Sequence, residues 1–526
     1  MIARQRIAAL AAGFAIAAGS FPAAAQPSAA ATRIVVQTDK PGATIERDIF
    51  GQFAEHLGTG IYGGVWVGKD SPISNVRGIR SDVVQALRAI RVPNVRWPGG
   101  CFADGYHWRD GIGPAAQRKH RLNASWGNVI EPNSFGTHEF FDFAEQVGAD
   151  VFLSVNVGSG TVQEAADWLE YLTADKPTSL AQERAANGRG KPYKIKYLGL
   201  GNENWACGGG MSNDHYVEMM KQFAIYSRNL DPAQAKTMKR VAVGWDSNKD
   251  DYTESVLKAW KARNWAWTIE GVSLHGYTIP NSWEKKGPSV NFGEDEYAKG
   301  LRATLKMKEW VAKQSAIMDR YDPEKAVGLY VDEWGIWADP NPGSNPGFLQ
   351  QQNTLRDAVI ASLNLNIFMR NADRVKGTNI AQMINVLQAM ILTDGPKMVL
   401  TPTYHLYHLY VPFQGAKVVP VSFEAGTYTL GDISLPRVDA VAARDPTGKL
   451  WLALTNVDPN RPAKLAAAIA AARGATGRVM TGVAVDAHND FAAPNAVAPK
   501  PYSGRLAGGQ LQFDLPPKSV AVVQVH

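Results

Sequence analysis

The sequence predicts an α/β protein, a (β/α)8 or TIM barrel followed by a C-terminal antiparallel β-sandwich that is jelly-roll-like. Two observations support this prediction. From about residue 49 to residue 395, short apolar runs alternate with amphipathic helical stretches, which is the pattern of a parallel sheet built from βα units. After about residue 400, short alternating segments are separated by turn residues, as in antiparallel sheets. A length of 526 residues suits one large barrel and a smaller domain.

Eight segments of the first region have the composition of strands. They are residues 48–58, 92–100, 151–158, 194–204, 240–246, 271–277, 327–335 and 378–386. Apolar residues three and four positions apart predict helices between them, for example at 81–90, 162–172, 215–230 and 355–372. Eight strands with intervening helices predict a closed barrel at residues 49–395.

The sandwich is expected at residues 396–526. Strand-like segments there include 416–423, 427–431, 450–457, 478–485 and 519–526. The Ala-rich stretch 464–473 has a helical propensity, so a strand there would require tertiary context to override it. A β-like segment within residues 26–48 is expected to join this sandwich.

Residues 1–25 have the pattern of a secretory signal peptide. Arg4 and Arg6 precede an apolar stretch, and small residues at 23–25 resemble a cleavage site. The apolar stretch is short for a membrane anchor. We therefore predict an exported protein, either periplasmic or secreted, with no membrane partner.

Charge and cysteine content restrict the function further. The net charge is +6, and the basic residues are scattered, so nucleic acid is not an expected partner. Cys101 and Cys207 are the only cysteines, which leaves no zinc pattern, and we predict no metal site. In an oxidising compartment the two could pair, but the sequence leaves this open.

The candidate catalytic residues are two glutamates at predicted strand ends, because barrel enzymes collect their function at the C-terminal ends of strands. Glu203 ends the fourth strand and Glu333 ends the seventh, and these strands face each other across a barrel mouth. Paired carboxylates suit glycoside hydrolysis, in which one protonates the leaving oxygen while the other attacks the sugar or activates water. Nearby aromatic residues offer flat faces for a sugar: Trp205, Trp334, Trp337 and Tyr277.

Each of these residues also has a simpler interpretation. A strand-end glutamate can bind an arginine or cap the next helix. His275 alone could be a satisfied polar residue, although its spacing from Tyr277 puts both on one face of the sixth strand. Asp332 precedes Glu333, so alternation predicts that it points away from the bore as a structural partner.

Seven sequence blocks stand out along the chain: FGQFAEHLG, VRWPGGCFADGYHWRDGIGP, GLGNENWACGGGM, SLHGY, VDEWGIW, NIAQMINV and TPTYHLYHLY. In order and spacing they resemble the α-L-arabinofuranosidases of family 51 of the glycoside hydrolases, and the likeness runs from about residue 32 to the C-terminus. The resemblance implies a retaining, exo-acting enzyme that needs no cofactor. It would release terminal arabinofuranosyl groups from arabinoxylan, arabinan or derived oligosaccharides, and family members are often homo-oligomers.

The resemblance also implies roles for individual residues. Glu203 would be the acid/base and Glu333 the nucleophile. Asn202 would bind the sugar 2-hydroxyl, and the arabinose subsite would be lined by Glu55, His275, Tyr277 and Gln382. Where some members have a site asparagine, this chain has Cys101, and both Cys101 and Cys207 flank site motifs. The loop 338–347 is expected to gate or shape the leaving-group side.

Two rival hypotheses remain at this stage. Another retaining barrel glycosidase, such as an endo-β-glucanase or a β-xylosidase, would need a long open cleft or a pyranose-shaped pocket. A catalytically silent carbohydrate-binding protein would keep the aromatic residues, but it would not explain the two glutamates.

Overall fold

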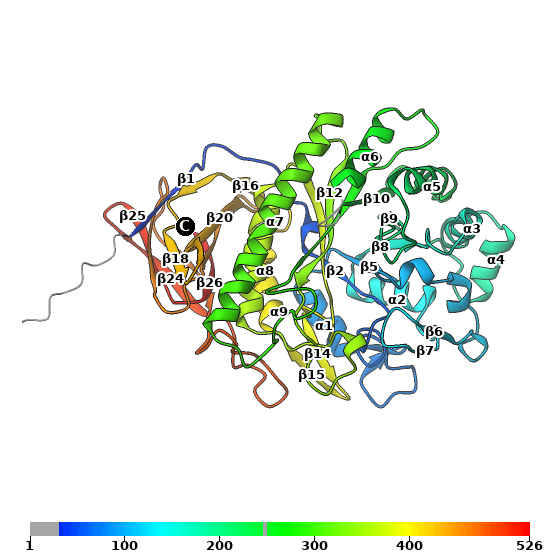
Figure 1. Cartoon of the computed structure of the whole chain (residues 1–526), viewed down its shortest axis with the longest axis horizontal. Coiled ribbons are helices and arrows are strands. Elements are labelled where there is room, and N and C mark those ends of the chain that lie inside the picture. Colours follow the sequence, from blue (N-terminus) through cyan, green and yellow to red (C-terminus); the bar gives the residue numbers. More distant parts are fainter. Residues whose placement is uncertain (1–30, 246–249) are drawn as a thin grey trace, which may run out of the picture.

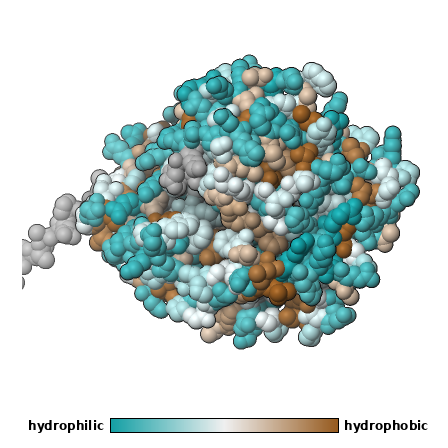
Figure 2. All heavy atoms as spheres, turned by 45° about the vertical axis from the view of Figure 1, so that its right-hand side comes forward, coloured by the Kyte–Doolittle hydropathy of each residue, from teal (hydrophilic) through white to brown (hydrophobic). Residues whose placement is uncertain are grey.

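The computed structural model describes residues 31–245 and 250–526. The predicted signal peptide, residues 1–25, lies outside the described residues. Within those residues, no helix combines the length and apolar character that crossing a membrane requires. The face shown in Figure 2 is mainly hydrophilic, with its hydrophobic residues in small separate groups.

Eight parallel strands close into a barrel, which confirms the predicted fold class. In chain order they are β2 (Gly51–Phe53), β5 (Asn94–Trp97), β8 (Asp150–Val155), β9 (Tyr197–Leu200), β10 (Lys239–Trp245), β11 (Gly271–Thr278), β12 (Gly328–Ile336) and β13 (Val375–Ile380). β13 closes the barrel by pairing with β2, Asn379 opposite Gly51. Each strand lies at one of the eight predicted segments.

Helices surround the barrel. They are α1 (Ser81–Ala89), α2 (Thr137–Val147), α3 (Val162–Thr173), α4 (Ser179–Ala186), α5 (Asn213–Tyr226), α6 (Asp250–Lys261), α7 (Glu294–Tyr321), α8 (Leu355–Arg370) and α9 (Pro402–Tyr410). α9 packs on α8, and the hydroxyl of Tyr404 donates a hydrogen bond to the carbonyl of Ala86 in α1. Because α9 thus closes the ring of helices, we propose that the barrel unit extends past residue 395 to the end of this helix.

Four short two-stranded hairpins lie in the connections between the main elements of the described part of the chain. They are β3 (Asn75–Val76) with β4 (Ile79–Arg80), β6 (Arg121–Asn123) with β7 (Val129–Glu131), β14 (Ile391–Asp394) with β15 (Lys397–Leu400), and β18 (Thr427–Leu430) with β19 (Ile433–Pro436). The β6–β7 hairpin belongs to the long segment between β5 and α2. That segment follows a strand at its C-terminal end, so it lies at the mouth of the barrel.

The C-terminal sandwich is one ten-stranded sheet folded on itself. Its order is β16 (Lys417–Val419), β20 (Val438–Arg444), β21 (Leu450–Asn456), β26 (Ser519–Val525), β23 (Ala475–Met480), β24 (Lys500–Ala507), β25 (Gln510–Leu515), β22 (Ala463–Ala468), β1 (Thr32–Val36) and β17 (Val421–Phe423). All pairings are antiparallel except that of β1 with β22. β22 lies in the Ala-rich stretch, where burial of Leu465 and Ala467 in the sandwich core overrides helical propensity.

The barrel and the sandwich are joined through α7 and α8, which lie between them (Figure 1). Every residue of α8 from Leu355 to Met369 is buried, as expected of a helix with packing partners on both sides. The hydroxyl of Tyr297 in α7 donates to the carbonyl of Val457, 2.8 Å away.

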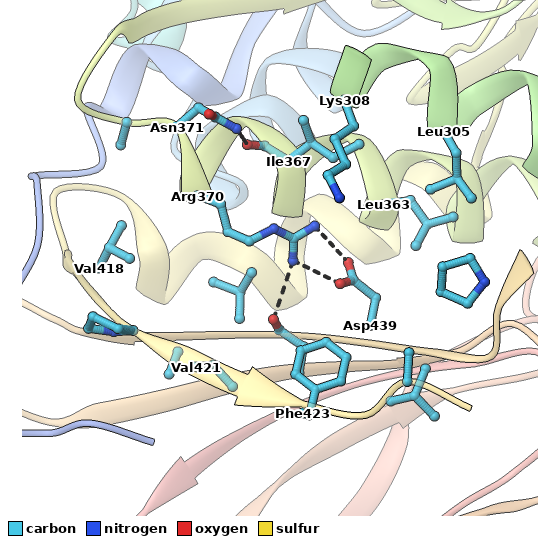
Figure 3. Close-up of a pocket in the computed structure, with 18 of the residues that line it drawn as sticks. Leu305, Lys308, Leu363, Ile367, Arg370, Asn371, Val418, Val421, Phe423 and Asp439 are labelled. Atoms are coloured by element: carbon cyan, nitrogen blue, oxygen red, sulfur yellow. Dashed lines mark hydrogen bonds and ion pairs between the residues drawn. The ribbon is translucent and has the colours of Figure 1, made fainter. Parts of the chain in front are cut away.

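A mostly aliphatic hollow of about 780 Å³ remains between these helices and the sandwich strands, and Arg370 meets Asp439 within it (Figure 3). The guanidinium of Arg370 donates to the Asp439 carboxylate at 2.8 Å. The amide of Asn366 donates to the same carboxylate at 2.9 Å. These bonds connect α8 directly to β20.

Candidate active site

Glu203 follows β9, where the chain turns sharply toward the barrel mouth. Its φ angle is +34°, in the left-handed region that non-glycine residues rarely adopt. The turn is held by the buried carboxylate of Asp104, which accepts hydrogen bonds from the backbone N–H groups of Asn202, Val157 and Gly158, each at 2.8 Å. The end of an apolar strand thus places a carboxyl group in the mouth.

Glu333 reaches the mouth from β12 through an irregularity in strand pairing. Ser273 of β11 pairs with Tyr330, but two residues later His275 pairs with Glu333, so β12 contains one extra residue. Strict alternation is interrupted there. As a result, the neighbouring Asp332 also contacts the site: it lies within ion-pair distance of His275 and Arg96, although it does not line the pocket.

His275 connects the two glutamates. Its Nδ1 donates to Glu203 Oε1 at 2.8 Å and lies 3.5 Å from Glu333 Oε2, and its Nε2 lies 3.2 Å from Asp332 Oδ1. One carboxylate oxygen from each glutamate and a ring nitrogen of His275 all lie within 4.8 Å of one another. The two carboxyl groups predicted from the strand ends therefore do converge.

The surroundings of the two glutamates differ. Burial raises the pKa of Glu203; a hydrogen bond and charge from His275 oppose this, while the charge of Glu333 adds to it. Burial lowers the pKa of His275, but the carboxylates of Glu333 and Asp332 outweigh that and hold it well above its usual value. His275 is therefore a protonated imidazole between carboxyl groups, and of these Glu203 is the one whose raised pKa favours the protonated form.

Arg96 holds the other carboxylate in place. Its Nη1 donates to Glu333 Oε1 at 2.9 Å and its Nη2 to Asn202 Oδ1 at 2.6 Å, while Nε lies 3.3 Å from Asp332 Oδ2. The hydroxyl of Tyr277 donates to Glu333 Oε2 at 2.9 Å. Both oxygens of Glu333 thus receive hydrogen bonds that fix the orientation of the carboxylate.

Glu55 and Gln382 form a second polar wall. The carboxylate of Glu55 accepts from Gln382 Nε2, from Trp126 Nε1 and from the backbone of Phe102, at 2.9, 2.8 and 3.0 Å. Burial and the nearby charge of Glu333 raise the pKa of Glu55 to about 7 against these bonds. Gly100 separates the two carboxylates, since a Cβ at this position would lie 2.8 Å from Glu333 Oε1 and 3.4 Å from Glu55 Oε1.

These groups lie in a pocket of about 530 Å³. Of the predicted site residues, the pocket is lined by Glu55, Glu203, Trp205, His275, Tyr277, Glu333 and Gln382, while Asn202 lies behind it against Arg96. Trp337 is a wall, as expected. The prediction for Trp334 is wrong: its indole is fully buried, donates to Thr378 and packs on Phe368, because it points outward from β12 toward α8.

Three of the tryptophans that line the pocket were not predicted from the sequence: Trp126, Trp283 and Trp310. Trp126 and Trp283 lie in irregular segments, where no periodicity indicates which side chains face a ligand, and Trp310 lies within the long helix α7. The high tryptophan content, 15 residues, was the only available signal. Trp283 and Trp337 meet edge to face, 5.0 Å between ring centroids, with the ammonium of Lys286 over both.

A disulfide and a hydrogen bond connect the loops around the pocket. Cys101 and Cys207 form a disulfide, which ties the segment after β5 to the segment after β9. Asn345, in the predicted gating loop, donates from Nδ2 to the carbonyl of Gly127 at 3.4 Å. A Cβ at Gly127 would lie 2.4 Å from the ring of Phe348, so the loop after β12 packs closely on the segment that carries Trp126.

The carboxylates and His275 are also side-chain types that bind metals. Here both ring nitrogens of His275 already face carboxylates, Nδ1 that of Glu203 and Nε2 that of Asp332, and the Arg96 cation faces Glu333. A metal ion would have to displace the imidazole proton and approach a guanidinium. The donor set therefore suits proton transfer and nucleophilic attack better than metal binding.

Family models match two parts of the chain. Residues 86–260 match a model described as "Alpha-L-arabinofuranosidase 1 domain". Residues 332–519 match a model described as "Alpha-L-arabinofuranosidase C-terminal domain". Between them, the two matches include the carboxyl ends of β9 and β12, from which Glu203 and Glu333 project.

Relatives match over nearly the whole length. An intracellular exo-α-L-arabinofuranosidase of Bacteroides ovatus is 40% identical and covers 97% of this chain and 98% of its own. A GH51 arabinofuranosidase structure from Xanthomonas axonopodis pv. citri has a TM-score of 0.91 at 46% identity, covering 94% of this chain and 100% of that one. An α-L-arabinofuranosidase from Thermotoga maritima, in complex with arabinose, has a TM-score of 0.82 at 31% identity, covering 94% and 99%.

The prediction of export is contradicted by these findings. The relative from Bacteroides ovatus is named an intracellular enzyme and matches this chain over 513 residues. The prediction depended only on the apolar and small-residue pattern of residues 1–25, which is a short segment interpreted from its composition alone. Identity over almost the entire chain outweighs that signal.

Fold, site and relatives agree with the motif blocks found in the sequence. The barrel carries two converging glutamates at the ends of β9 and β12, and the identity to the relatives extends through the sandwich. The chain belongs to family 51 of the glycoside hydrolases, the α-L-arabinofuranosidases.

Proposed function

We propose that this protein removes terminal, non-reducing α-L-arabinofuranosyl groups with retention of configuration. The observation that carries the proposal is the approach of Glu203 and Glu333, with oxygens within 4.8 Å at the base of one pocket. Retaining glycosidases place their carboxyl groups about 5–5.5 Å apart, whereas inverting enzymes leave room for a water molecule at about 6.5–9.5 Å. The short separation supports a covalent route.

Glu333 is the nucleophile in this proposal. Arg96 and Tyr277 orient it by their hydrogen bonds, and its carboxylate oxygen forms a bond to the anomeric carbon as the glycosidic C–O bond breaks. Glu203 gives its proton to the departing oxygen in the same step. The raised pKa of Glu203 supports this role, because an acid must hold its proton at the working pH.

Glu203 then acts as the base. It takes a proton from water, whose oxygen attacks the anomeric carbon while the bond to Glu333 breaks. This step releases arabinose and restores both carboxyl groups to their starting protonation states. His275, which donates to Glu203 at 2.8 Å, stabilises the carboxylate that exists between the two steps.

The pocket walls supply the sugar contacts in this proposal. Glu55 and Gln382 face the cavity and offer carboxylate and amide groups to ring hydroxyls, and Trp205 offers an apolar face. Asn202 has its Oδ1 occupied by Arg96, so its Nδ2 is the group proposed to reach the 2-hydroxyl.

An exo mode fits the shape of the site. The loop after β12 packs on the segment around Gly127, which limits the pocket on one side, and no long open cleft is needed for a single terminal sugar. We propose arabinoxylan, arabinan and their oligosaccharides as substrates. Assembly into a homo-oligomer is part of the same proposal and can be measured by light scattering.

The two glutamates are tested by azide rescue on an activated aryl α-L-arabinofuranoside. Glu333→Ala should lose at least about a thousandfold in kcat, and azide should yield the β-azide, because the azide replaces the nucleophile. Glu203→Ala should yield the α-azide, since azide then attacks the glycosyl-enzyme. Glu183→Ala, an exposed ion-pair residue of α4, is the control and should be unaffected.

Near-normal hydrolysis by Glu333→Ala would end the assignment. The same azide anomer from both glutamate variants would exclude the separate roles given to them. An aryl-glycoside panel separates the rival activities, because a β-xylosidase or endo-β-glucanase would prefer xylosides or glucosides to arabinofuranosides.

A further inference from the structure

A second hollow, of about 800 Å³, lies at the opposite end of the barrel from the two glutamates. Its lining comes from residues 224–240, which end α5 and lead into β10, and from residues 263–268, which follow α6 and lead into β11. These segments precede their strands. The hollow is therefore at the N-terminal end of the barrel, separate from the mouth where the glutamates lie.

The stretches of chain that contain these two segments, residues 224–240 and 258–270, are strongly basic. Residues 224–240 and 258–270 carry seven lysines and arginines but only two acidic residues, Asp231 and Glu270. Both acids already accept hydrogen bonds: Asp231 Oδ1 from the backbone of Ala233, and Glu270 Oε2 from the backbone of Arg240. Seven cations against two carboxylates leave these stretches with a net positive charge.

Three arginines line the hollow: Arg228, Arg240 and Arg263. Across residues 31–245 and 250–526, none of them has a carboxylate within ion-pair distance. Arg228 is exposed and Arg240 is half-buried. Burial and the charge of Arg228 lower the pKa of Arg240, against the opposing effect of Glu270. A bound anion would relieve this repulsion between cations.

Each arginine is anchored by a backbone carbonyl. Arg228 Nε donates to Ile225 at 2.8 Å, Arg240 Nη2 to Ser227 at 3.2 Å and Arg263 Nη1 to Trp260 at 2.6 Å. The guanidinium of Arg263 also stacks 4.0 Å above the ring of Trp260. Anchoring of this kind orients the guanidinium groups while leaving further N–H donors for a ligand.

An exposed aromatic ring lies beside these cations. Trp265 is 97% exposed, and the hollow is also lined by Trp267 and by the amide side chains of Asn229 and Asn264. An indole left almost wholly in water offers a flat face for the C–H surface of a sugar ring, and the amides offer groups for its hydroxyls. Guanidinium groups recognise carboxylates with paired hydrogen bonds.

We propose that this hollow binds an acidic saccharide, with the carboxylate of a uronic acid unit held by Arg228, Arg240 and Arg263 and the sugar ring on Trp265. Such a site would attach the enzyme to an acidic polysaccharide while the mouth remains free. The inference goes beyond the reaction at Glu203 and Glu333 and does not depend on it.

The test is calorimetric binding of trigalacturonate at low salt to the full chain. The wild type should bind it, and the uncharged methyl ester of the same trisaccharide should bind at least about tenfold more weakly. The exposed pair Arg228→Ala with Arg263→Ala, and separately Trp265→Ala, should each weaken binding at least about fivefold. Arg505→Ala, an exposed arginine of β24, is the control and should leave binding unchanged.

Four outcomes would overturn the proposal. They are no binding by the wild type, equal binding by the variants, equal binding of the methyl ester, and full displacement by an equal concentration of inorganic phosphate, which would indicate an anion site without sugar recognition. A changed oligomeric state of Trp265→Ala with unchanged binding would instead assign the residue to an interface. Hydrolysis of the aryl arabinofuranoside is measured in parallel, so failure of the catalytic proposal is seen independently.

Discussion

His275 is the residue at which the charges of the site meet. Its Nδ1 donates to Glu203 and lies 3.5 Å from Glu333, and its Nε2 lies 3.2 Å from Asp332. Because it is held protonated, it lowers the pKa of Glu203, while burial of that carboxyl raises it. The pKa of Glu203, the proposed acid/base, is therefore set by burial and by His275, which act in opposite directions. Removing the imidazole should change the pH range of activity.

We expect His275→Ala to move the alkaline limb of the pH profile of kcat/KM to higher pH. In the proposed mechanism the acid form of Glu203 is the active one, so activity should be lost as the pH rises through its pKa. Without the imidazolium that pKa rises, and the loss should occur about one pH unit higher, with a lower maximum. A limb that stays in place or moves to lower pH would contradict this mechanism; His215→Ala, an exposed histidine of α5, is the control.

At the scale of elements, the mouth depends on an irregular strand and on loops that pack on each other. The extra residue in β12 brings Asp332 and Glu333 to the same cluster. Above them, the loop after β12 contacts the segment of Gly127 through Asn345 and Phe348. The contact needs a glycine, since Gly127 has a φ of +72° and a side chain there would meet the Phe348 ring.

Gly127→Ala should displace Phe348 and with it the adjacent Leu349, which lines the pocket. KM for arabino-oligosaccharides should therefore rise by at least about threefold, while hydrolysis of a small aryl glycoside changes less. Gly113→Ala is the matched control. Gly113 has a similar φ of +74°, but a Cβ there meets nothing within 4 Å. Equal effects of the two substitutions on KM would show that backbone strain, and not the loop contact, is responsible.

At the scale of the whole molecule, the hydrophobic core of the barrel extends into the sandwich, which also has a core of its own. The cluster that contains the barrel strands also includes Val441, Ala453 and Val522 of the sandwich. α8 is buried from both sides, and Asp439 of β20 accepts hydrogen bonds from Asn366 and Arg370 (Figure 3). Such an arrangement couples the stability of the two units.

Asp439→Ala should lower the free energy of unfolding by about 1–3 kcal/mol, because the buried amide of Asn366 loses its acceptor. One unfolding transition should remain, with kcat/KM unchanged. Asp432→Ala removes an exposed ion pair between α7 and the same sandwich and should have little effect. Urea unfolding measures both; two separate transitions in Asp439→Ala would show that the units unfold independently.

Much of this architecture could be predicted from the sequence, because strand and helix periodicities differ and recur eight times. The ends of β9 and β12 also identified Glu203 and Glu333. Other features depend on packing: the extra residue of β12 that brings Asp332 to His275, and the outward direction of Trp334, follow from strand register and not from residue type. Trp126 and Trp283 lie in loops, where sequence carries no directional signal.

The left-handed backbone of Glu203 has an implication for how this protein can change over time. A non-glycine residue in that conformation costs about 1–3 kcal/mol, so a glycine at position 203 would relax the turn while abolishing proton transfer. Selection for stability alone would favour the loss of this residue. If Glu203 is the proposed acid/base, selection for turnover keeps it there, and laboratory lineages freed from that demand should lose this glutamate early.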